Sequence, residues 1–66
     1  MKMVINGEDR NFLPGLTVHN LLLEMGIVPE SIIVEHNGQF VQRSEFATTA
    51  ISDGDTLELI QFVGGG

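Results

Sequence analysis

The stretch TVHNLLLEMG, residues 17–26, is the part of the sequence whose apolar side chains recur with the period of an α-helix. Thr17 is suited to the N-cap, because its hydroxyl can accept a hydrogen bond from an unpaired backbone N–H of the first turn. Gly26 is suited to the left-handed conformation that ends many helices. The sequence therefore predicts one helix over residues 17–25, with an apolar stripe formed by Val18, Leu21, Leu22 and Met25.

Short strand patterns lie on both sides of this helix. The Asn6-Gly7 and Asn37-Gly38 dipeptides are typical of tight hairpin turns, because both turn residues need a positive φ. The two acidic residues after Gly7 favour a first loop longer than two residues. The predicted strands cover residues 1–6, 10–13, 32–35 and 56–63, and a further strand begins at residue 40.

The order of elements is strand, strand, helix, strand, strand, strand. This order predicts an α+β domain, in which a mixed sheet of four to five strands carries one main helix on one face. Alternation along the last strand directs Leu57 and Leu59 toward the helix. Phe46 and Ile51 are expected to fill the core from an irregular connection.

The other face of the predicted sheet carries more apolar side chains than is usual for a surface exposed only to water. We therefore expect it to dock a partner protein. A shift of one residue in register would exchange the two faces, so this assignment depends on the alternation within each strand. The predicted docking residues are Val4, Ile33, Ile60, Phe62 and Val63.

Composition limits the classes of function that the chain can perform. Its 66 residues make one small domain, and the absence of cysteine excludes disulfides, iron–sulfur clusters and thiolate zinc sites. A net charge of −6 argues against nucleic acid and favours partners with basic surfaces. The sequence has neither a membrane-length apolar run nor a signal-peptide pattern, so we expect a soluble, cytoplasmic domain.

Residues for catalysis are not grouped in any familiar pattern. His19 and His36 have no spacing that indicates a metal site or a catalytic triad. Asp53 and Asp55 flank Gly54, as is typical of a turn. No phosphate-binding loop is present. The sequence therefore predicts a protein that binds no cofactor or metal and is not itself an enzyme.

The glycine run Gly64-Gly65-Gly66 follows the predicted domain of residues 1–63 directly. Such a run is also typical of a frayed terminus or an added tag. Glycine has no Cβ, however, so this segment can enter a narrow cleft in any backbone conformation. We expect residues 64–66 to be a flexible tail whose carboxylate a partner activates as an acyl-adenylate. Attack by a sulfur nucleophile would then leave a thiocarboxylate on Gly66.

Four segments together resemble the ThiS family, the sulfur carriers of thiamin biosynthesis, over almost the whole chain. They are residues 34–38, 43–46, 53–58 and 62–66, and the helix fits the same pattern, although Asn20 stands where an acidic residue is expected. The resemblance implies a ubiquitin-like β-grasp fold. It also implies that an E1-like adenylyltransferase of ThiF type uses ATP to activate Gly66. A persulfide donor then supplies sulfur, which passes to a thiazole synthase of ThiG type.

Three other functions share features with this pattern. The small subunit of molybdopterin synthase has the same fold and diglycine end, although its chains are usually longer. A ubiquitin-like protein modifier is activated in the same way and forms an isopeptide bond. A ligand-binding β-grasp module needs no free glycine end, so the tail counts against it.

Overall fold

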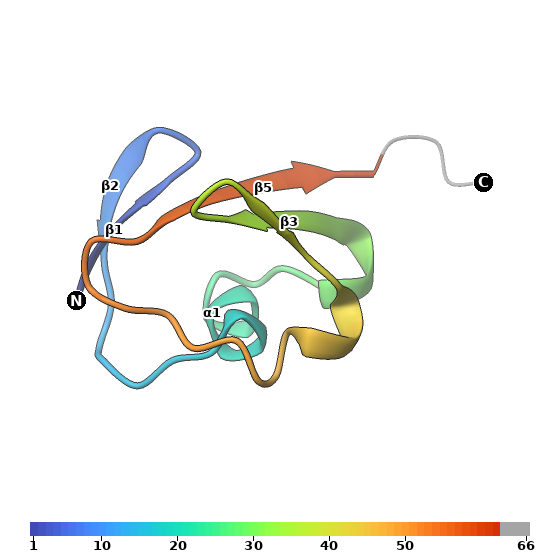
Figure 1. Cartoon of the computed structure of the whole chain (residues 1–66), viewed down its shortest axis with the longest axis horizontal. Coiled ribbons are helices and arrows are strands. Elements are labelled where there is room, and N and C mark those ends of the chain that lie inside the picture. Colours follow the sequence, from blue (N-terminus) through green and yellow to red (C-terminus); the bar gives the residue numbers. More distant parts are fainter. Residues whose placement is uncertain (63–66) are drawn as a thin grey trace.

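A computed structural model describes residues 1–62 as a five-stranded sheet with one α-helix packed against one face (Figure 1). The strand order is β2-β1-β5-β3-β4, and the central β1–β5 pair is parallel while the other pairs are antiparallel. This arrangement confirms the α+β prediction and fixes the number of strands in the described part at five. The elements are β1 Lys2–Ile5, β2 Glu8–Asn11, α1 Val18–Glu24, β3 Ile32–His36, β4 Gln39–Val41 and β5 Thr56–Gln61, with 3₁₀ turns η1 Pro29–Ser31 and η2 Arg43–Glu45.

Helix α1 begins and ends where its local sequence predicts. The Thr17 hydroxyl oxygen accepts a hydrogen bond from the Asn20 backbone N–H at 3.2 Å, and the same hydroxyl donates to Asn20 Oδ1 at 2.8 Å. Asn20 thus supplies a capping acceptor in place of the expected acidic residue. At the other end, Gly26 has a φ of 74°, and the Ile27 N–H bonds back to the Leu22 carbonyl at 2.8 Å. These features form a Schellman cap, which ends the helix.

Both asparagine–glycine turns have positive φ at both residues, as predicted, with values of 51° and 82° at Asn6 and Gly7. The expectation of a longer first loop is wrong, because Ile5 pairs directly with Glu8 across a two-residue turn. The predicted second strand, residues 10–13, is also displaced, since β2 runs from Glu8 to Asn11. All four residues of this edge strand are exposed and none is apolar, so their alternation carried no signal of a core-facing side.

The core lies between α1 and the sheet. Leu57 and Leu59 of β5 point into it, which confirms the predicted alternation. Phe46 is 2% exposed and Ile51 is 5% exposed, so both fill the core from the long connection between β4 and β5. The buried core residues are Met3, Ile5, Val18, Leu21, Leu22, Ile32, Val34, Val41, Phe46, Ile51, Leu57 and Leu59. Within residues 1–62, no helix combines the length and the apolar character that crossing a bilayer requires.

Candidate functional site

The predicted reactive group lies beyond the part of the chain that the structure describes. Gly66, its neighbours Gly64 and Gly65, and the predicted docking residue Val63 all fall outside residues 1–62. The described structure does fix where this segment leaves the domain. Phe62 follows β5, and its N–H donates to the Ser31 carbonyl at 3.1 Å, so the ladder with the β3 side continues to this residue. The site is therefore built on the end of β5.

Strand β5 is held on both sides by backbone and side-chain bonds. Five residue pairs join it to β3, and two join it to β1. Where β1 ends, the Asn6 side chain continues the ladder, because its Oδ1 accepts from the Leu59 N–H at 2.7 Å and its Nδ2 donates to the Leu59 carbonyl at 3.3 Å. Asn37 Oδ1 likewise accepts from the Thr56 N–H at 2.9 Å. Both turn asparagines thus fix the strand that precedes the tail.

The face of the sheet opposite α1 exposes apolar side chains beside the end of β5. Ile60 is 48% exposed and Phe62 is 53% exposed, so the structure confirms that both point away from the core. Val4 and Ile33 share this face but are half-buried between neighbouring strands. Phe40 on β4 is 65% exposed and was not among the predicted docking residues. Its alternation with the buried Val41 was the sequence signal that could have identified it.

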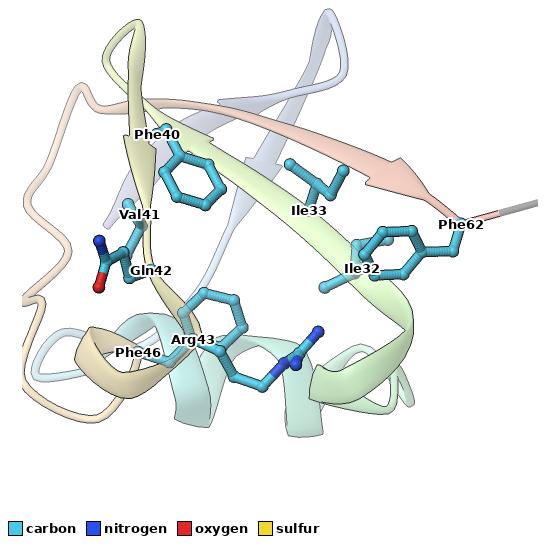
Figure 2. Close-up of a pocket in the computed structure, with 8 residues that line it drawn as sticks. All are labelled: Ile32, Ile33, Phe40, Val41, Gln42, Arg43, Phe46 and Phe62. Carbon is cyan, nitrogen blue, oxygen red and sulfur yellow. The ribbon is translucent and has the colours of Figure 1, made fainter.

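A shallow groove of about 460 Å³ runs along the β3–β4 side of this region (Figure 2). Figure 2 shows Phe40 and Phe62 on opposite sides of Ile33, with Arg43 below them. Arg43 is held at the groove by a hydrogen bond from its Nη2 to the Glu30 carbonyl at 3.1 Å. The residues that line the groove are Ile32, Ile33, Phe40, Val41, Gln42, Arg43, Phe46 and Phe62. The groove is largely apolar and has a single charged residue in its lining, which suits contact with a protein surface.

A polar cluster around Asp55 was missed by the sequence analysis, which assigned this residue only to a turn. The Asp55 Oδ2 lies 2.7 Å from His36 Nε2 and accepts the Ser52 N–H at 2.8 Å, while its Oδ1 accepts from Asn37 Nδ2 at 3.1 Å. Burial of the carboxyl group opposes its charged form, but the hydrogen bonds from His36, Ser52 and Asn37, together with the charge attraction of His36, outweigh this effect. The pKa of Asp55 is therefore lowered below its usual 3.8.

The hydrogen bonds of this cluster hold two turns of the fold together. The cluster joins the β3–β4 turn to the turn before β5, and each carboxylate oxygen of Asp55 has a protein partner. His19 is not part of it. Over residues 1–62, no three histidine, aspartate or glutamate side chains gather closely enough to hold a metal ion. The cluster therefore fixes the start of β5 against the end of β3.

Comparison with known proteins gives a consistent family assignment. The family model for ThiS matches residues 3–66. The chain is 30% identical to the sulfur carrier protein ThiS of Escherichia coli, with 100% of both chains covered. A crystal structure of the thiamine biosynthesis protein ThiS from Geobacter metallireducens matches with a TM-score of 0.86 at 33% identity, again over 100% of both chains. This match confirms the predicted β-grasp fold.

Part of a larger protein is also similar to this chain. A thiazole synthase of Paramagnetospirillum magneticum is 48% identical over all 66 residues. The chain spans only 20% of the length of that protein, and the same share of a second thiazole synthase, from Magnetococcus marinus, which is 36% identical. The match of the family model over nearly the whole sequence decides the assignment, and the chain belongs to the ThiS family.

Proposed function

We propose that this chain carries sulfur for the synthesis of the thiazole ring of thiamin, as a protein cosubstrate of partner enzymes and not as an enzyme itself. The observation that carries the proposal is the ThiS family match, which extends through the glycine run to residue 66. The sulfur carrier of Escherichia coli matches over the same full length. The described geometry supports this role, because β5 is paired on both sides and apolar side chains are exposed at its end.

The proposed chemistry takes place on the carboxyl group of Gly66. A carboxylate resists nucleophiles, so an E1-like enzyme of ThiF type first joins it to the AMP part of ATP and releases pyrophosphate. The terminal sulfur of a persulfide donor then displaces AMP and forms an acyl disulfide with the donor. A thiol cleaves the S–S bond of this intermediate by disulfide exchange, which leaves the thiocarboxylate on Gly66 and a disulfide on the donor side. ATP binds to the activating partner in this scheme. We propose the cytoplasm as the location of the reaction, since ATP is available there.

The division of labour between domain and tail follows from backbone chemistry. Gly64 and Gly65 carry no Cβ, so an enzyme can accept them in a channel too narrow for other residues. The domain supplies what the glycines lack, namely side-chain surface for recognition. Ile60 and Phe62 provide exposed apolar area directly before the tail, and Phe40 and Ile33 extend it sideways. We therefore assign docking to this face and sulfur transfer to Gly66.

We propose a thiazole synthase of ThiG type as the enzyme that receives the sulfur. The similarity of the chain to a fifth of two thiazole synthases supports this partner, because it shows related sequence within proteins of that name. Transfer to a molybdopterin precursor is the competing outcome, and it is distinguished by offering both acceptors to the loaded chain.

The experiment that tests the proposal is intact-protein mass spectrometry. The chain is incubated with the activating enzyme, ATP, a persulfide donor and a thiol reductant, and the variant lacking Gly66 is treated identically. We expect a mass increase equal to the exchange of one oxygen for one sulfur, located by fragmentation on Gly66 and absent from the deletion variant. An unchanged mass, with an activating enzyme that modifies a known carrier in parallel, would contradict the proposal.

A further inference from the structure

The exposed face of the sheet places two glutamates directly opposite each other. Glu35 of β3 pairs with Glu58 of β5, next to the Ile33–Ile60 pair. Two residues further along the same strands, Asn37 and Thr56 form a hydrogen-bonded pair, because the Asn37 N–H donates to the Thr56 carbonyl at 2.8 Å. Hydrogen-bonded and non-hydrogen-bonded pairs alternate along an antiparallel ladder. Glu35 and Glu58 are therefore also a hydrogen-bonded pair, with about 5.5 Å between their Cα atoms. Directly opposed side chains share one face of a sheet, so the two glutamate side chains are neighbours on this surface.

No basic side chain of the domain neutralises this pair. Residues 1–62 contain all three lysine and arginine residues of the chain. The ion pairs there are Lys2 with Asp9 at 3.9 Å and His36 with Asp55 at 2.7 Å, and neither includes Glu35 or Glu58. Like charges that face each other across two strands destabilise a sheet. We therefore expect the pair to lower the stability of the folded domain, since no ion pair within residues 1–62 offsets it.

The pair borders apolar side chains on one side, while the polar residues Asn37 and Thr56 follow on the other. Ile33 and Ile60 lie next to it along the strands, and Phe40 of β4 lies opposite Glu35. A surface that covers these apolar side chains would also remove water from the two carboxylates. Two desolvated and unpaired carboxylates are strongly unfavourable, whereas a cation between them satisfies both.

The proposed function brings such a surface to this face. Even when fully extended, the four residues after Phe62 span at most about 14 Å, so an enzyme acting on Gly66 must approach the end of β5 closely. Helix α1 covers the other face of the sheet, which leaves the exposed face for contact (Figure 1). An interface of standard size buries about 800 Å² on each partner, which is roughly 30 Å across and reaches from Phe62 past Glu58.

We propose that the surface of the activating enzyme that covers this face places an arginine or lysine side chain between Glu35 and Glu58. This inference rests on the proposed function for the identity of the partner. The pair then acts as a recognition element: the apolar side chains supply contact area, and the two charges select a surface with a cation at one position. Such a device lowers the stability of the free domain and improves discrimination between partners.

The test uses Glu58→Gln, with Glu24→Gln on α1 as the control that changes net charge equally outside this face. Thermal unfolding should show a higher Tm for Glu58→Gln, by about 1–5 °C, because the repulsion is removed. Calorimetry with the activating enzyme in the absence of ATP should show a Kd at least about tenfold higher for Glu58→Gln, while Glu24→Gln remains close to the parent. Binding of Glu58→Gln should also depend less on salt.

Pyrophosphate release, measured separately, distinguishes failure of this inference from failure of the proposed function. If the parent chain is adenylated but Glu58→Gln binds as well as Glu24→Gln, the inference is overturned and the function stands. If binding falls as expected but no chain is adenylated, the recognition element stands and the function fails. A lower Tm for Glu58→Gln, or a parent chain that does not bind the enzyme, also overturns the inference.

Discussion

Phe62→Asp tests the docking face at the residue that the structure places closest to the tail. Phe62 is 53% exposed, so about 100 Å² of its apolar surface is available to a partner. Covering that area contributes about 2.5 kcal/mol, and its loss raises the Kd for the activating enzyme by about sixtyfold. The aspartate adds a charge that the interface must desolvate, so this figure is a lower bound.

The same substitution has a smaller effect on folding. The buried half of Phe62, about 90 Å², contributes about 2 kcal/mol, which corresponds to a Tm lower by about 8–16 °C in a domain of this size. The domain should therefore remain folded at room temperature, since a chain of this length is stable by about 3–10 kcal/mol. Circular dichroism follows folding, and calorimetry with the activating enzyme follows binding.

Leu13→Asp is the matched control for Phe62→Asp. Leu13 lies in the loop between β2 and α1 and is 82% exposed. Its replacement by aspartate therefore adds the same charge outside the proposed interface. Its Kd should stay close to that of the parent chain. Equal binding by Phe62→Asp and Leu13→Asp would refute the docking assignment. Unfolding of Phe62→Asp at room temperature would refute the reasoning from its exposure.

Three further predictions concern the core, the Asp55 cluster and the tail. Phe46→Ala should lower the Tm by at least about 12 °C, because emptying a buried phenylalanine site costs about 3–5 kcal/mol, and a Tm close to the parent's would contradict its place in the core. The folded pKa of Asp55 is below 3.8, so the folded chain holds fewer protons than the unfolded chain in acid, and stability falls as the pH drops through this range. Asp55→Asn should therefore be less stable at neutral pH and lose less stability on acidification, as measured by urea unfolding at each pH; identical pH profiles would contradict this. Deleting Gly66 should abolish adenylation, measured as pyrophosphate release, and leave the Tm unchanged. Adenylation of the deletion variant at the rate of the parent chain would contradict the role of Gly66 as the acceptor.

The local elements of this fold were predictable because their signals lie within a few residues. Thr17 and Gly26 mark the two ends of the helix, where hydrogen bonds join residues only a few positions apart. The Asn37-Gly38 turn depends on its own backbone angles. The alternation of Leu57 and Leu59 was also sufficient to orient β5. The geometry of these features depends on neighbouring residues only, so it could be predicted from the sequence.

The errors arose where pairing between distant segments decides the structure. The position of β2 follows from its register with β1, since four exposed polar residues contain no periodic signal of their own. The bond between His36 and Asp55 joins residues 19 positions apart, and it depends on β3 lying beside β5. The Glu35–Glu58 pair likewise exists only in this register. Which residues form the exposed face was thus predictable in part, but which of them face one another was not.

Sulfur transfer is the most direct test of the proposed role. The chain is loaded on Gly66 with isotopically labelled sulfur, purified, and offered in separate reactions to thiazole synthase with its small substrates and to molybdopterin synthase with its precursor. We predict that the label appears in the thiazole product and leaves the chain in the first reaction. Label that stays on the chain in the first reaction, or that moves only to the molybdopterin precursor, would contradict this prediction.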